Sequence, residues 1–212
     1  MSEPRLLPEH PRHAVVLGLV AVLAALVVAV LGVRYAGEGE PGGVDARLAE
    51  ALYGVEPPWR SVALAMDSLG EPFGAAALVV PILAGCLLLR RPRAAVFVVV
   101  GVGLAVGTAT LLKHLAGRTI HGDNLSYPSG HTAFATSLAL VVAMAATRRA
   151  AGTLFVVAAA LVAGAVMGWA QVALGAHYPT DVLGGWCTAL AVMPATAWLV
   201  DRAADQLRRD RP

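Results

Sequence analysis

The chain is poor in charged residues and in cysteine, and each shortage argues against a class of protein. Only 14% of its 212 residues are charged and 58% are hydrophobic, whereas a soluble domain carries about 25% charged residues. The formal net charge of +2 is too small for a nucleic-acid-binding protein, and the basic residues are scattered. Cys86 and Cys187 stand inside apolar runs, which predicts small packing residues instead of a disulfide framework or a metal site.

The abundant apolar residues are gathered in six runs that approach the roughly 20 residues a helix needs to cross a bilayer. These runs are 14–33, 73–89, 94–112, 132–146, 150–170 and 182–200. The first run follows Arg5 and Arg12, as in a signal peptide, but its length and the lack of a cleavage site favour a retained span. The sequence therefore predicts an all-α, polytopic membrane protein with six transmembrane helices in one bundle. Residues 14–200 would form this domain, between cytoplasmic tails at 1–13 and 201–212.

The placement of arginine and lysine predicts the orientation of the bundle, because cytoplasmic loops are rich in both. With both termini in the cytoplasm, the five outer basic residues are Arg34, Arg47, Arg60, Lys113 and Arg118. The other eleven of the 16 lie inside, namely Arg5, Arg12, Arg90, Arg91, Arg93, Arg148, Arg149, Arg202, Arg208, Arg209 and Arg211. We therefore expect a plasma or inner membrane protein whose loops after the third and fifth spans face outward.

The segment 34–72 is long for a linker between two spans. Apolar residues recur in it at helical spacing, first at Val44, Leu48 and Leu52 and then at Trp59, Val62, Ala63, Met66 and Leu69. This pattern predicts two short helices at the membrane interface. A loop packed over the bundle and a gate for a substrate both remain open as its role.

Two pairs of glycines predict close contacts between helices. Gly103 with Gly107 and Gly164 with Gly168 are each four residues apart inside an apolar run. Small residues at this spacing let two helix backbones approach in lipid. We expect a partner helix against each pair.

Polar residues concentrate in two segments, 113–131 and 171–181, which the charge count places outside. Four of the six histidines lie there. Polar side chains at membrane depth are costly and usually functional. The sequence thus predicts a functional site at the outer end of the bundle.

The only lysine of the chain, Lys113, ends the third span. It could mark the membrane boundary by extending its ammonium group to the interface, or it could bind an anion. Arg118 follows five residues later, and two cations near one helix end favour the anion site.

The tetrapeptide Pro128, Ser129, Gly130 and His131 directly precedes the fourth span. Proline and a capping serine are typical of a helix start, and the free amide groups of such a start attract anions. His131 would then lie beside a bound phosphate. The alternative is an ordinary capped helix with an interfacial histidine.

His177 and Asp181 are four residues apart at the start of the sixth span, so one helical turn brings them to the same face. A carboxylate that accepts a hydrogen bond from one imidazole nitrogen leaves the other nitrogen free to attack. The pair is therefore a candidate nucleophile with its orienting partner.

Together these residues resemble three motifs of the type 2 phosphatidic acid phosphatase family, the lipid phosphate phosphatases. The family pattern is Lys-x6-Arg-Pro, then Pro-Ser-Gly-His, then Ser-Arg-x5-His-x3-Asp. The second motif is complete here, and the third keeps His177 and Asp181 at the required spacing. Two positions depart from it. Ile120 and His121 stand where the first motif has Arg-Pro, and Ala170 and Gln171 stand where the third has Ser-Arg.

The resemblance implies a six-helix fold and hydrolysis of a lipid phosphate monoester or diphosphate at the outer face. It implies that His177 attacks phosphorus, that Asp181 orients it and that His131 protonates the leaving alcohol. The expected phosphate ligands are Lys113, Arg118, Ser129, Gly130, Gln171 and His121. No cofactor or metal is expected, because the motifs lack the clustered carboxylates of a magnesium site.

Two rival functions share the same anion site. A non-catalytic phospholipid-binding or transport protein is favoured by the missing arginines, whereas the His177–Asp181 pair argues against it. A lipid phosphotransferase would use the same nucleophile with an alcohol acceptor. In each case we expect a lipid phosphate and membrane lipids as the binding partners, and no nucleic acid.

Overall fold

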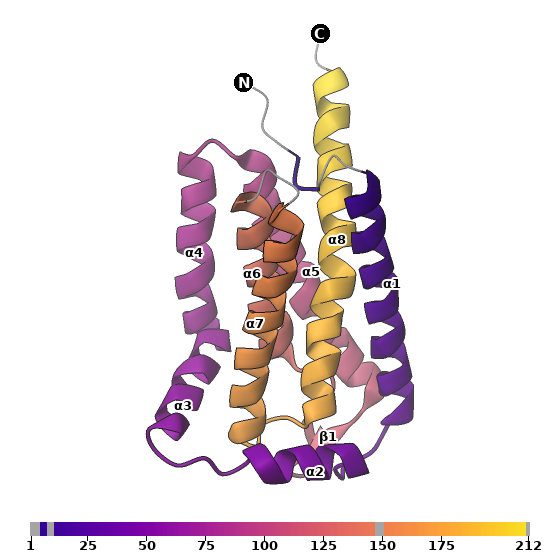
Figure 1. Ribbon diagram of the computed structural model, residues 1–212, viewed down its shortest axis with the longest axis vertical. Coiled ribbons are helices and arrows are strands. Elements are labelled where there is room, and N and C mark those ends of the chain that lie inside the picture. Colours follow the sequence, from indigo (N-terminus) through magenta and orange to yellow (C-terminus); the bar gives the residue numbers. More distant parts are fainter. Residues whose placement is uncertain (1–4, 8–10, 147–150, 211–212) are drawn as a thin grey trace.

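A bundle of helices capped at one end by a short helix and a hairpin forms the structure, which is a computed structural model (Figure 1). It describes residues 5–7, 11–146 and 151–210. The helices are α1 Pro11–Arg34, α2 Gly43–Leu52, α3 Trp59–Gly70, α4 Pro72–Leu88, α5 Pro92–Ala116, α6 Gly130–Ala146, α7 Ala151–Ala173 and α8 Pro179–Arg209. The hairpin pairs β1 Thr119–Ile120 with β2 Asn124–Leu125.

Each of the six predicted runs corresponds to one helix, and the prediction of an all-α multi-pass membrane protein is confirmed. Among the described residues, four helices are long and apolar enough to cross a membrane, namely α1, α5, α7 and α8. The helices α3 and α4 count as one further span if their 67° bend is included, and α6 is a shorter apolar helix. The six-helix count therefore agrees approximately. Arg148, Arg149 and Arg211, used for the orientation, lie outside the described residues.

The linker 34–72 contains the two predicted short helices. Helix α2 crosses the end of the bundle, and α3 runs up into α4 (Figure 1). Val44 and Leu48 of α2 are exposed, whereas Asp45 is fully buried. The helix thus turns Asp45 toward the bundle and these apolar residues outward, as an interfacial helix in contact with lipid would.

Helix α8 packs against α1, α5, α6 and α7, and two glycines of α7 permit its close approach. A β-carbon at Gly168 would lie 2.2 Å from Val182 Cγ1, and one at Gly164 would lie 2.7 Å from Trp186 Cδ1. This pair therefore has the predicted partner helix. Within the described part of the chain, nothing lies within 4 Å of a β-carbon built at Gly103 or Gly107, so the other pair has no such partner there.

The helix α8 extends past the predicted span to Arg209. Asp201 is buried there, where it accepts hydrogen bonds from the backbone nitrogens of Leu6 and Leu7 and from Arg93. The expected C-terminal tail is thus largely a continuation of the helix. The start of α1 and the end of α8 lie at one end of the bundle, and α2 and the hairpin lie at the other (Figure 1). The two polar segments belong to the end with α2.

Candidate active site

Two glycines at the start of α8 bring the second and third motifs together. A β-carbon at Gly185 would stand 2.2 Å from the carbonyl oxygen of Ser129, and one at Gly184 would stand 2.4 Å from the Tyr127 ring. The backbone nitrogen of Ser129 also donates to the carbonyl oxygen of Asp181, at 2.9 Å. The start of α6 is therefore fixed against the start of α8, although 50 residues separate them in sequence.

Asp181 is the fully buried centre of the site. It is the third residue of α8, and its Oδ2 accepts a hydrogen bond from the backbone nitrogen of Tyr178 at 3.0 Å. A carboxylate at this place is stabilised by the free amide groups and dipole of the helix start. Its Oδ1 accepts from Arg118 Nη1 at 2.7 Å. The carboxylate is thus held on both oxygens before any substrate binds.

His177 lies in the turn before α8, with its side chain only 9% exposed. Its Nδ1 is 3.8 Å from Asp181 Oδ2, which is longer than a hydrogen bond. Such catalytic contacts are often long in the resting enzyme and shorten when substrate binds. Burial lowers the pKa of His177, and the nearby Lys113 and His131 add to this effect while Asp181 opposes it. The imidazole is thus kept neutral, which is the form able to attack an electrophile.

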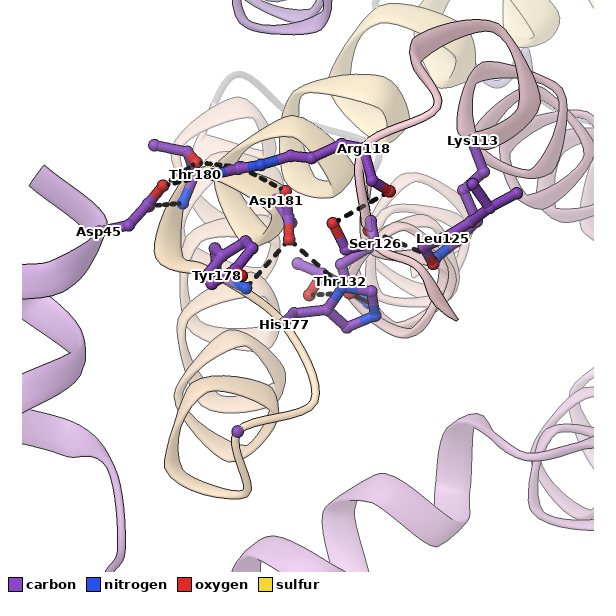
Figure 2. Close-up of polar contacts among 12 residues, drawn as sticks. Asp45, Lys113, Arg118, Leu125, Ser126, Thr132, His177, Tyr178, Thr180 and Asp181 are labelled. Carbon is purple, nitrogen blue, oxygen red and sulfur yellow. Dashed lines mark hydrogen bonds and ion pairs between the residues drawn. The ribbon is translucent and has the colours of Figure 1, made fainter. Parts of the chain in front are cut away.

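Arg118 has other partners than the phosphate expected from the sequence. Its guanidinium group is fully buried and donates to Asp181 and to Asp45 Oδ2, each at 2.7 Å. The rings of Tyr35 and Tyr178 lie on it, with centroids 4.1 and 4.4 Å from Cζ. Figure 2 shows this side chain reaching toward Asp45 and Thr180, with His177 beyond Asp181. The geometry makes Arg118 a support of Asp181.

Asp45 is a member of this network that the sequence analysis missed. Its two oxygens accept hydrogen bonds from Arg118 and from the backbone nitrogen and Oγ1 of Thr180, all between 2.7 and 2.9 Å. Helix α2 is thereby tied to the start of α8. The sequence did contain a signal for this contact, because Asp45 is an acidic residue next to Val44. The segment was interpreted only through the spacing of its apolar residues.

Lys113 donates to the carbonyl oxygens of Leu125 and Ser126, at 2.8 and 3.3 Å. These bonds hold its ammonium group under the loop that leads into α6 (Figure 2). An ammonium group has three donors, and the described residues accept from two of them, which leaves one for a ligand.

Ser129 caps α6 as expected. Its Oγ accepts hydrogen bonds from the backbone nitrogen and Oγ1 of Thr132, at 3.3 and 3.1 Å. Its hydroxyl group is thus engaged within the protein. Gly130 begins α6, and no atom of the described residues lies within 4 Å of a β-carbon built there. The helix start is therefore open beside Gly130.

His131 faces two carboxylates that the sequence analysis did not connect with it. Its Nε2 lies 3.5 Å from Asp67 Oδ1 and 3.6 Å from Glu71 Oε1, and it has no hydrogen-bond partner among the described residues. Gln171 is buried and donates from Nε2 to Asp67 Oδ1 at 2.8 Å. The motifs contain no cluster of carboxylates, but Asp67 of α3 and Glu71, which follows α3, place two of them beside His131.

His121 lies at the turn of the hairpin with φ of 50°. Its Nε2 is 2.8 Å from the carbonyl oxygen of Gly175, and the contact is exposed. His121 thus joins the hairpin after α5 to the turn after α7. The described contacts do not connect it to His131 or His177.

Residues 112–205 match the family model described as the PAP2 superfamily. This range contains Lys113, His131, His177 and Asp181. It does not contain Asp45, Asp67 or Glu71. The fold is similar to the crystal structure of the first transmembrane PAP2 type phosphatidylglycerolphosphate phosphatase from Bacillus subtilis. The TM-score is 0.69 at 23% identity, over 90% of this chain and 98% of that chain. No curated protein matches the sequence. The resemblance drawn from the motifs is thus supported: residues 112–205 match the PAP2 superfamily model, and the fold is that of a PAP2 type phosphatase.

Proposed function

We propose that the protein is a membrane phosphatase that hydrolyses a lipid phosphate through a phosphohistidine at His177. One observation carries the proposal. A buried imidazole whose pKa is lowered lies beside a held carboxylate, with a second histidine and the ammonium group of Lys113 near enough to affect its charge. Perturbed groups gathered in this way are typical of catalytic sites.

The phosphate would lie over the start of α6, between His177 and Lys113. The free donor of Lys113 and the amide groups of Gly130 and His131 can hold its oxygens, because a helix start attracts anions. Ser129 contributes by capping the helix, and Gly130 by leaving the space open. Arg118, Gln171 and His121 are assigned to positioning, since each is engaged with protein atoms.

The reaction has two steps. The Nε2 of His177 bonds to phosphorus while the bond from phosphorus to the ester oxygen breaks, and His131 gives its proton to the departing alcohol. Water then attacks the phosphohistidine, His131 takes a proton from it, and phosphate and free His177 are released. The cations and amides stabilise the charge on the phosphoryl oxygens in both steps.

A lipid substrate is supported by an apolar cavity of about 410 Å³ between α3, α4, α6 and α7. Its lining includes Met66, which is next to Asp67, and Met167, which is one turn from Gln171. An acyl chain held there would leave the head group near His131. The similar Bacillus subtilis protein is a phosphatidylglycerolphosphate phosphatase, which favours a lipid phosphate monoester. The excess of arginine at the opposite end of the bundle supports an outward-facing site.

The test is phosphate release by the purified protein in detergent from phosphatidate, phosphatidylglycerol phosphate and polyprenyl diphosphate. His177→Ala should lose at least about a thousandfold in rate, because no other group replaces the nucleophile. Rapid quenching with labelled substrate should trap acid-labile phosphate on the wild type alone. A His177→Ala variant that remains active would overturn the mechanism. Added acceptor alcohol distinguishes a transferase, which would form a new ester at the expense of free phosphate.

A further inference from the structure

We propose that Asp67, Glu71 and His131 form a binding site for a divalent transition-metal ion, and that an ion bound there inhibits the enzyme. The three residues come from the end of α3, the bend before α4 and the start of α6. One ligand atom from each lies within 4.8 Å of the other two. Nothing in the proposed reaction uses Glu71.

The distances from Nε2 of His131 to the two carboxylates fit ligands of one metal ion better than they fit direct hydrogen bonds. Nε2 of His131 is 3.5 and 3.6 Å from the two carboxylates, beyond ordinary hydrogen-bonding distance. Two ligands bound tetrahedrally to zinc at about 2.1 Å stand about 3.4 Å apart. The Nε2 atom is also buried without a hydrogen-bond partner among the described residues. An ion between the three groups would supply that partner and would offset the repulsion between the carboxylates.

The site is partly preorganised by α7. The buried side chain of Gln171 donates to Asp67, and Trp59 packs edge-on against Trp169 at 6.3 Å between ring centroids. Both contacts fix α3 to α7. Hydrogen bonds that orient a ligating carboxylate strengthen metal binding. The Glu71 side chain is 59% exposed, so it has room to rotate and complete the set.

The ligand types select the class of metal. One imidazole nitrogen with two carboxylate oxygens suits zinc, cobalt or manganese, whereas magnesium and calcium prefer oxygen ligands alone. Three protein ligands leave a position for water, as in open zinc sites.

The inhibitory consequence rests on the proposed function, with Nε2 as the nitrogen through which His131 transfers protons. An imidazole nitrogen bound to a metal ion cannot carry a proton. Metal at this site would therefore stop protonation of the leaving alcohol without touching His177.

Binding is tested on the full chain in detergent after chelator treatment, by zinc calorimetry and by the visible absorption of bound cobalt. We expect one ion per chain for the wild type and for His177→Ala. The affinity should fall at least about tenfold in Glu71→Gln and His131→Gln, since loss of even an outer partner of a ligand costs 10 to 100-fold. Glu50→Gln, an exposed acidic residue of α2, is the matched control. Absence of binding, or equal binding by Glu71→Gln, would overturn the proposal.

Inhibition is tested by phosphate release at rising zinc concentration. Wild type and Glu50→Gln should be inhibited over the range in which zinc binds, whereas Glu71→Gln, measured against its own zinc-free rate, should need at least about tenfold more zinc. Equal inhibition of all three would refute the inhibitory role. If no phosphatase activity were found, the binding measurements would still report on the metal site, so the two proposals fail separately.

Discussion

Gly185 of α8 faces the carbonyl oxygen of Ser129 so closely that a β-carbon at position 185 would stand 2.2 Å from it. The obstacle is backbone, which cannot rotate away as a side chain can. The hydrogen bond from Ser129 to the carbonyl of Asp181 joins the same two segments. The distance between the start of α6 and the start of α8 therefore depends on the lack of a β-carbon at position 185.

Gly185→Ala is expected to lower both stability and activity. The extra carbon must push α8 away from the start of α6, and overpacking of this kind costs about 1 to 3 kcal/mol. Thermal unfolding in detergent and phosphate release measure the two effects. Gly103→Ala is the control, because a β-carbon there meets no atom within 4 Å. Equal behaviour of the two variants would contradict the role given to Gly185.

The sequence predicted the fold well because lipid imposes a simple pattern. Apolar runs of nearly membrane-spanning length gave all six long elements, and the helical spacing in the linker gave α2 and α3. The exact ends were less predictable. Helix α8 begins at Pro179, where Asp181 accepts a hydrogen bond from the backbone nitrogen of Tyr178, whereas the predicted run began at residue 182. At its other end α8 continues past residue 200, where Arg93 and the backbone of Leu6 engage Asp201.

The motifs of the candidate site were predictable, but their supports were not. His131, His177 and Asp181 stand at recognisable spacings within the two polar segments, 113–131 and 171–181. Asp45, Asp67 and Glu71 reach the same end of the bundle only through tertiary packing of the linker. No local sequence pattern predicts these contacts, because acidic residues are also common on the solvent-exposed faces of helices.

The pH dependence of kcat/KM should have its acid limb below pH 6.5, the ordinary pKa of histidine. The folded environment lowers the pKa of His177, so the neutral, attacking form persists to lower pH and is lost only as pH falls through the lowered value. Lys113→Gln removes one of the charges that lower this pKa, and its acid limb should move to higher pH. An acid limb above pH 6.5 in the wild type would contradict the assignment of His177.

Catalysis is expected to proceed without a metal ion. Lys113 and the amide groups at the start of α6 offset the charge of the phosphate, and His131 transfers the protons. No step of the proposed reaction therefore requires a Lewis acid. Activity after exhaustive chelation should equal or exceed the initial activity. A loss that magnesium restores would mean that the phosphate is bound through a metal ion.

Arg118→Ala should destabilise the protein by about 3 to 5 kcal/mol, because it leaves the carboxylates of Asp45 and Asp181 buried without their charged partner. Arg118→Lys should recover only part of this, since an ammonium group lacks the planar fork and stacks poorly between Tyr35 and Tyr178. Unfolding in detergent measures the loss, with Arg47→Ala as the control at an exposed arginine of α2.

Stability and rate, measured together, separate two roles of Arg118, namely support of Asp181 and direct contact with phosphate. If Arg118 supports Asp181, the combination Asp45→Asn with Arg118→Lys should be less destabilised than the sum of the single changes, because both act on one network. A phosphate ligand would instead leave stability unchanged and lower the rate about a hundredfold to a thousandfold. A stable but slow Arg118→Ala variant would therefore show that Arg118 binds the phosphate and does not support the carboxylate of Asp181.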